Sequence, residues 1–211
     1  MAELPGVALI TGAGSGISSH RCCQPMSIVH GIWLMGNLGI GQATALAFVH
    51  AGCTRLSIMD LNAKGLEDTR DKITAINSDV KINLAAGDTT DADFVDRIVE
   101  TTVTKFGRLD YGVNAAGIMG PWANSQDLKM EDLDRVMNVN YRGTFLCARA
   151  EVRAMLKNDP TGPGDIPGQR GVIVHVGSGL GSVGIPGARK YPILSFLLLS
   201  SKTLLADNRM C

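Results

Sequence analysis

The sequence has no excess of charge of either sign, and it has few aromatic side chains. Lysines and arginines number 20, aspartates and glutamates also number 20, and aromatic residues make up 5% of the chain. Proteins that bind nucleic acids usually present a basic stripe or patch, so we expect no nucleic acid as a partner. Long hydrophobic runs are missing as well. The apolar stretches 28–40 and 193–201 are interrupted or shorter than the roughly 18 residues of a membrane span, so we expect no membrane segment.

Cysteine is sparse, and its spacing matches no known framework. The five cysteines form no C-x-x-C motif, and residues 1–5 lack the basic start of a secretory signal. Both observations favour a reduced, cytoplasmic setting. Cys22 and Cys23 lie near His20 and His30 in the sequence, but two adjacent cysteines cannot easily serve one tetrahedral metal site. We therefore predict no metal ion.

Two glycine-rich segments together match a phosphate-binding strand–turn–helix. The first, 11–17, follows the apolar run 7–10, and the second, 39–48, opens with Gly-Ile-Gly and continues with helical spacing. Removing 23 residues, roughly 17–39, would join them. Asp60, which ends the next apolar run, would then follow Gly16 by 21 positions rather than 44, close to the spacing of about 20 in dinucleotide-binding motifs. We interpret 17–39 as an insertion within a nucleotide-binding turn.

Segments with strand and helix patterns alternate along the chain. We predict strands at 7–10, 55–60, 80–86, 109–114 and 171–176, and helices at 42–50, 61–77, 91–106 and 130–156. This alternation is typical of an α/β fold with a Rossmann-type, doubly wound parallel sheet, which binds its ligand at the carboxyl ends of the strands. A chain of 211 residues has the size of one such domain, so we assign 1–211 to a single domain.

Several motifs in this order resemble those of the short-chain dehydrogenase/reductase family. The turn Thr11-Gly12-x-x-x-Gly16, continued at Ile40-Gly41, is similar to the family's cofactor turn, and the Asn-Ala-Ala-Gly run at 114–117 is similar to its motif after the fourth strand. The resemblance covers 7–16 and 40–192, and it implies five of the family's seven strands. The residues implied as catalytic are Asn140, Ser178 and Tyr191, and those implied as cofactor-binding are Gly12, Gly14, Gly16, Ile40, Gly41, Asp60, Asp88, Asn114, Ala115 and Gly117.

The resemblance also implies a function. Members transfer a hydride between NAD(P) and a small carbonyl or alcohol substrate, with Tyr191 in the position of the general acid/base and Ser178 in that of the group polarising the substrate oxygen. Asp60 favours NAD over NADP, because a carboxylate accepts hydrogen bonds from the ribose 2′-hydroxyl and repels a 2′-phosphate. The family often pairs its long helix between subunits, which is compatible with a homo-oligomer.

Two segments depart from the family pattern. Ser195 stands where the family has a lysine, four residues after its tyrosine, and neither 17–39 nor 193–211 is related to family sequence. Two hypotheses account for this: both segments are retained introns, or the chain is a catalytically inactive, truncated relative that binds nucleotide weakly or not at all. In either case we expect the fifth strand to form an edge of the sheet that the leucine-rich tail after residue 192 covers only in part.

The proposed site residues also have plainer interpretations. Asp60 and Asp88 each precede a predicted helix and could cap it. Asn114 and Asn140 could satisfy buried backbone groups, and Ser178, between two glycines, could be a turn residue. The order of the motifs favours the functional interpretation.

Overall fold

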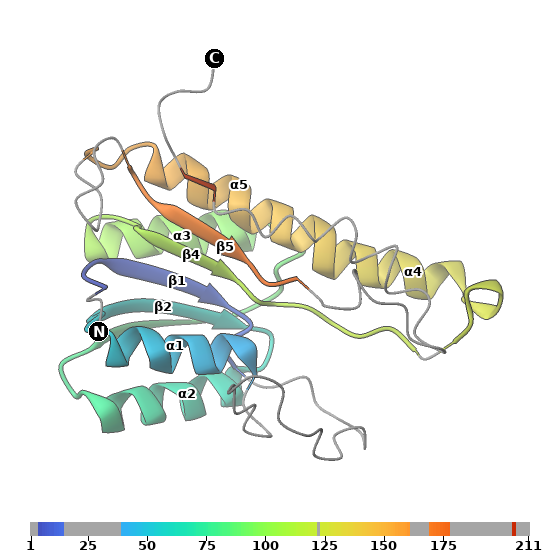
Figure 1. Cartoon of the computed structure of the whole chain (residues 1–211), viewed down its shortest axis with the longest axis horizontal. Helices are drawn as coiled ribbons and strands as arrows, with labels where there is room; N and C mark the ends of the chain where they lie inside the picture. The colour runs from blue at the N-terminus through green and yellow to red at the C-terminus, as the bar shows by residue number, and fades with distance from the viewer. Residues whose placement is uncertain (1–3, 15–38, 122, 161–168, 178–203, 206–211) are drawn as a thin grey trace, which may run out of the picture.

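The computed structural model describes residues 4–14, 39–121, 123–160, 169–177 and 204–205. These residues contain a parallel sheet in the order β3-β2-β1-β4-β5. Its strands are β1 (Val7–Thr11), β2 (Arg55–Asp60), β3 (Lys81–Ala86), β4 (Tyr111–Asn114) and β5 (Val172–His175). The chain builds outward from the central strand on one side and then returns to build on the other (Figure 1). This is the doubly wound order, so the predicted α/β fold is confirmed.

Helices cover both faces of the sheet (Figure 1). One hydrophobic cluster joins the sheet to α1 (Ile40–His50) and α2 (Ala63–Ile76), and a second joins it to α3 (Ala92–Phe106) and α5 (Thr144–Met155). Successive side chains of a strand point to opposite faces, and β1 supplies Ile10 to the first cluster and Leu9 to the second. Burial on both faces therefore explains why β1 is a continuous apolar run.

The N-termini of α2 and α3 are capped by residues other than Asp60 and Asp88. Asn62 caps α2 by accepting a hydrogen bond from Gly65 N at 3.1 Å. Asp91 caps α3 by accepting from the backbone N–H groups of the second and third residues beyond it. The alternative in which Asp60 and Asp88 are the helix caps is therefore wrong, which leaves their carboxylates to other contacts.

The predicted helix 130–156 is helical throughout but not uniform. It comprises α4 (Met130–Met137), the π-helical segment η2 (Asn138–Gly143) and α5, and a short 3₁₀ turn, η1 (Ser125–Asp127), precedes it. A π-helical turn accommodates one extra residue and is common at functional sites. Here it coincides with Asn140, whose side chain bonds to a neighbouring loop instead of facing solvent.

The far edge of β5 is partly paired, in agreement with the expectation that the tail covers only part of this edge. Leu204–Leu205 form a short strand, β6, that runs antiparallel to β5 opposite Val172 and Ile173. An open edge presents unpaired backbone groups that can recruit another strand, and two residues of β6 pair with half of β5. Within the described part of the chain, none of the helices is both long and apolar enough to cross a membrane.

Candidate functional site

The glycine turn follows β1 at the carboxyl end of the sheet. Gly12 has φ of 71°, and a methyl group there would lie 2.8 Å from the backbone nitrogen of Ala116. Glycine is suited to this position because it has no Cβ to strain or collide. The carboxyl end of β1 therefore lies directly against the segment that follows β4.

The start of α1 lies against the same turn. Gly41 is buried, and a methyl group on it would overlap the carbonyl group of Gly12. Ile40, the first residue of α1, is 53% exposed. The two glycine segments, which are separated in the sequence, are thus adjacent in the structure, and the helix presents its N-terminus to the turn, an arrangement suited to phosphate. Gly16 lies outside the described residues.

Asp60 ends β2 with its carboxylate fixed beside the turn. Its Oδ2 accepts a hydrogen bond from Gly14 N at 2.9 Å, and its Oδ1 accepts one from Asn62 N at 2.8 Å. Asp88 is exposed between β3 and α3, where Oδ1 accepts from Thr90 N at 2.8 Å. Both acids therefore lie at the carboxyl edge of the sheet, and Asp60 contacts the glycine turn directly.

The segment after β4 is tied to β1 by one hydroxyl group. The buried Thr11 Oγ1 accepts hydrogen bonds from Ala115 N at 3.1 Å and Ala116 N at 3.0 Å. Gly117 is exposed, and a methyl group on it would lie 3.3 Å from Asn140 Oδ1. The structure thus brings the glycine turn, the Asn-Ala-Ala-Gly motif and Asn140 into one neighbourhood.

The side chain of Asn140 holds the loop after β4. Its Oδ1 accepts from Ile118 N at 2.8 Å, and its Nδ2 donates to Ile118 O at 2.9 Å. Val176 N donates to Asn114 O at 2.9 Å, so the chain leaves β5 for Ser178 at this edge of the sheet. Ser178 and Tyr191 themselves lie outside the described residues.

Asn114 belongs to a buried polar cluster on the α5 side of the sheet. Its Nδ2 donates to Glu151 Oε2 at 2.9 Å and lies 3.4 Å from Nδ1 of His175. Glu151 is fully buried, and burial raises its pKa to about 7, although the hydrogen bond from Asn114 acts in the opposite direction. Burial likewise lowers the pKa of His175. Among the described atoms, Asn114 Oδ1 and Glu151 Oε1 have no hydrogen-bond partner.

Sequence reasoning did not identify Thr69 or Glu151, although both carry a recognisable signal. Thr69 lies three residues after Leu66 and four before Ile73, which are both buried, and it occupies the same face of α2. Glu151 lies four residues after the buried Cys147. A polar residue at an apolar position of a helix needs a partner, and this rule would have identified both.

Comparison with known proteins assigns the chain to a family. The model of the short chain dehydrogenase family matches residues 33–192. Chanoclavine-I dehydrogenase of Aspergillus fumigatus is 34% identical over 148 residues, which cover 68% of this chain and 54% of that protein. An uncharacterized oxidoreductase of Thermotoga maritima is 32% identical over 200 residues, which cover 95% of this chain and 64% of that protein. The chain therefore spans roughly half to two thirds of the length of these relatives.

A solved structure agrees with this assignment. The crystal structure of NAD⁺-bound xylitol dehydrogenase superimposes with a TM-score of 0.70 at 26% identity, over 92% of this chain and 61% of that one. Together with the doubly wound sheet, the glycine turn and the Asn-Ala-Ala-Gly motif, these matches show that the chain belongs to the short chain dehydrogenase family.

Proposed function

We propose that the protein is an NAD(H)-dependent oxidoreductase that transfers a hydride between the nicotinamide and a small carbonyl or alcohol substrate. One observation carries the choice of cofactor: the Asp60 carboxylate is fixed beside the glycine turn by Gly14 N. A carboxylate at this position can accept hydrogen bonds from the ribose 2′-hydroxyl and repels a 2′-phosphate. The NAD⁺-bound state of the xylitol dehydrogenase structure is consistent with the proposal.

The described residues fit a dinucleotide. A Cβ at Gly12, Gly14 or Gly41 would collide with backbone atoms or with the Asp60 side chain, so the glycines allow the turn, the start of α1 and the end of β2 to pack closely. Dinucleotide-binding turns use this close packing to present backbone N–H groups and a helix N-terminus to a pyrophosphate. Asp60 would hold the adenosine ribose. Asp88 would contact the adenine, and the segment 114–117 would complete the site. The bound nicotinamide would supply the hydride acceptor or donor.

Side chains of the protein would transfer the proton to or from the substrate oxygen. In our proposal Tyr191 gives a proton to, or takes one from, the substrate oxygen, and Ser178 donates a hydrogen bond to that oxygen. Both polar atoms of the Asn140 side chain, the acceptor Oδ1 and the donor Nδ2, bond to the backbone of Ile118. The amide of Asn140 would therefore act indirectly, by holding the loop after β4 in place.

Cofactor titration tests the proposal. The change in protein or cofactor fluorescence on adding NADH or NADPH to the full chain gives both dissociation constants, and we expect NADH to bind more tightly. Asp60→Asn removes the charge and should narrow the difference between the two cofactors. Equal or tighter binding of NADPH by the unaltered protein would contradict the assignment.

Turnover is tested separately from binding. Oxidation of NADH in the presence of a panel of ketones and aldehydes should depend on Tyr191, so Tyr191→Phe should abolish turnover while NADH binding is retained. No feature of the described residues favours the alternative, a catalytically inactive relative, over this function. Cofactor binding without turnover of any carbonyl or alcohol would support that alternative. The cytoplasmic location stays a prediction, which cell fractionation tests.

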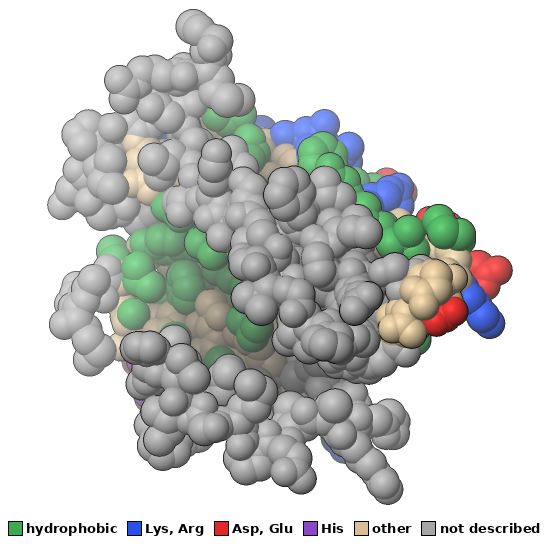
Figure 2. Space-filling model, turned by 45° about the vertical axis from the view of Figure 1, so that its right-hand side comes forward, with side chains coloured by type: hydrophobic (Ala, Val, Ile, Leu, Met, Phe, Trp, Pro, Cys, Tyr) green, Lys and Arg blue, Asp and Glu red, His purple; other side chains and the backbone are tan. Residues whose placement is uncertain are grey.

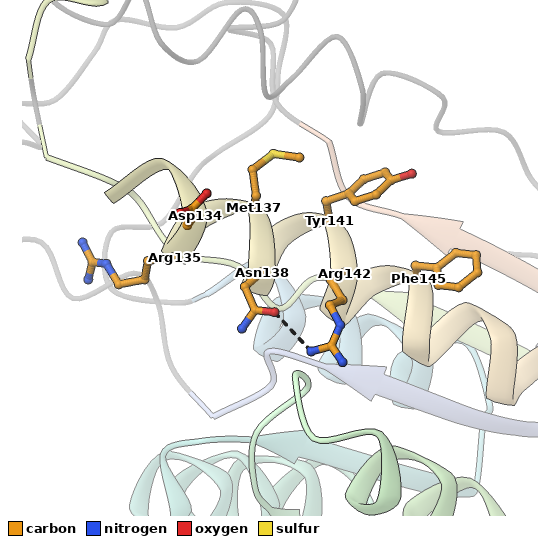
Figure 3. Close-up of a pocket in the computed structure, with 7 residues that line it drawn as sticks. All are labelled: Asp134, Arg135, Met137, Asn138, Tyr141, Arg142 and Phe145. Carbon is orange, nitrogen blue, oxygen red and sulfur yellow. Dashed lines mark hydrogen bonds between the residues drawn. The ribbon is translucent and has the colours of Figure 1, made fainter. Parts of the chain in front are cut away.

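We also propose that the protein forms a homo-oligomer through the helix that contains α4, η2 and α5. Hydrophobic and basic side chains lie at the surface along the edge where this helix runs (Figure 2). Met137, Tyr141 and Phe145, spaced four residues apart, project to one side, whereas Asn138 and Arg142 project to the other and bond to each other at 3.3 Å (Figure 3).

Exposure of this apolar stripe supports a protein contact. Tyr141 is 46% exposed and Phe145 is 58% exposed, and contiguous exposed apolar side chains mark interaction surfaces. Phe145→Glu should therefore lower the mass measured by light scattering after gel filtration. Ile76→Glu, at an exposed apolar residue of α2, is the matched control. A monomeric unaltered protein would refute the proposal.

A further inference from the structure

A chain of hydrogen bonds connects the surface of α2 to the glycine turn. Lys72 Nζ donates to Gln42 Oε1 at 2.9 Å, and Gln42 Nε2 donates to Thr69 Oγ1 at 2.6 Å. Thr69 Oγ1 in turn donates to Ala13 O at 2.6 Å. Gln42 and Thr69 are 3% and 0% exposed, whereas Lys72 is exposed. The connection therefore passes from solvent into the interior and ends on the backbone of the turn.

The connection continues through one peptide group. The carbonyl of the Ala13–Gly14 peptide accepts from Thr69, and the N–H of the same peptide donates to Asp60 Oδ2. Both polar groups of this peptide are thus held by side chains. A rotated peptide would lose both bonds and would direct its carbonyl oxygen, which repels an anion, toward the side where its N–H now lies.

All donors in this series point the same way. In each hydrogen bond the donor lies on the Lys72 side and the acceptor on the Asp60 side, so the series starts at a cation and ends at a carboxylate. Hydrogen bonds arranged in this way polarise and strengthen one another inside a protein. Since Lys72 is exposed, its share is reduced by solvent screening, and Thr69 is the buried link on which the series depends.

We propose that Thr69, Gln42 and Lys72 are positioning residues for cofactor binding: they fix the Ala13–Gly14 peptide and, through it, the orientation of the Asp60 carboxylate. This inference rests on the proposed NAD(H)-binding function. The three residues do not contact the cofactor themselves. They fix the orientation of the Asp60 carboxylate, which would bind the ribose. Because the Ala13–Gly14 peptide is already held in place before the cofactor binds, binding does not include the entropic cost of ordering it.

A purely structural role of Thr69 is the competing explanation. Thr69 Oγ1 also lies 2.9 Å from Gly65 O, one turn earlier in α2, and such a bond is common for threonine in helices. Thr102 supplies a matched comparison, because it is equally buried, bonds to Ile98 O one turn earlier at 2.7 Å and contacts Ser57 Oγ at 2.6 Å. Thr102 is bonded within α3 and to β2, and none of its hydrogen bonds among the described residues reaches the glycine turn.

The test compares Thr69→Val with Thr102→Val and Thr69→Ser in the full chain. Each valine removes a buried hydroxyl while keeping the shape, so both should lower the midpoint of denaturant unfolding. We expect only Thr69→Val to raise the Kd for NADH, by about tenfold or more, because only this variant removes the hydrogen bond that holds the Ala13–Gly14 peptide. Thr69→Ser should restore binding. Lys72→Met, at the exposed end, should raise the Kd by about threefold, with Lys64→Met as its surface control.

Hydrogen exchange provides a readout that needs no cofactor. In the unliganded protein, the amide of Gly14 should exchange faster in Thr69→Val than in Thr102→Val. Equal Kd values for the two valine variants would overturn the inference and leave the proposed function intact. If the unaltered protein binds neither NADH nor NADPH, the proposed function fails. In that event, an unchanged exchange rate of the Gly14 amide in Thr69→Val overturns the positioning role as well. A faster exchange rate in Thr69→Val would still show that Thr69 fixes the turn.

Discussion

Replacing Glu151 by glutamine should make the protein more stable at neutral and alkaline pH. The glutamate is fully buried, and its folded-state pKa is about 7 against an ordinary value of 4.5. Because the folded state holds the proton more tightly, the free energy of unfolding falls as the pH rises from about 4.5 to about 7 and is level on either side. Glutamine cannot ionise, and its Oε1 can still accept the hydrogen bond from Asn114.

The size of the effect follows from the two pKa values. Each pH unit between them corresponds to about 1.4 kcal/mol, so ionised Glu151 lowers the free energy of unfolding by about 3 kcal/mol at pH 8. The difference in free energy of unfolding between Glu151→Gln and the unaltered protein should therefore be near zero at pH 4.5 and should reach its full value above pH 7. Few single substitutions stabilise a protein by this amount.

Urea denaturation followed by circular dichroism, at a series of pH values from 4.5 to 8.5, measures the difference. Glu100→Gln is the matched control, because Glu100 is an exposed residue of α3, and its curve should follow that of the unaltered protein. A constant difference between Glu151→Gln and the unaltered protein across this range would refute the reasoning. Such a result would mean that Glu151 is ionised, and its charge compensated, throughout.

Three further predictions concern the turn and the buried thiols. Gly12→Ala should lower the free energy of unfolding by about 1–3 kcal/mol and weaken NADH binding, because the added methyl group would lie 2.8 Å from backbone atoms. Gly52 also has a positive φ but has open space around it, so Gly52→Ala should leave NADH binding unchanged. Equal losses of NADH affinity in the two variants would contradict this prediction. Thr11→Val leaves two backbone N–H groups unpaired and should lower stability by about 2 kcal/mol in thermal melts, with recovery in Thr11→Ser. Burial raises the pKa of Cys147, and only the thiolate form reacts. A disulfide reagent should therefore modify Cys147 only after the protein unfolds. Modification of Cys147 in the folded protein at the rate of an exposed thiol would refute this prediction.

The fold could be predicted from the sequence because its signals are local. The strands 55–60 and 171–176 are short apolar runs between turns, and the alternation with helices leads to a parallel sheet. The contact between Asp60 and the glycine turn was also predictable, since the carboxyl ends of neighbouring parallel strands meet at one edge. The adjacency of Gly12 and Gly41 followed from treating the two glycine segments as one motif.

The remaining features depend on contacts between distant residues. Nothing near Glu151 in the sequence indicates that its partner is Asn114, 37 residues earlier, or that Gly112 leaves room for the carboxylate. The π-helical segment has an ordinary helical pattern, and its irregularity arises where Asn140 bonds to Ile118. The pairing of β6 with β5 joins residues about 30 positions apart, and no local pattern indicates that they pair.

The central place of β1 has a consequence for synthesis of the chain on the ribosome. Of the strands in the described residues, β1 is the first to emerge, yet Ala8 pairs on one side with Tyr111, which follows 103 residues later. At about 5–20 residues per second, β1 waits roughly 5–20 s for this neighbour. During that interval one edge of a strand that is fully buried in the folded protein stays open to other nascent chains. Early binding of a chaperone to β1, or faster translation up to β4, should therefore raise the yield of folded protein.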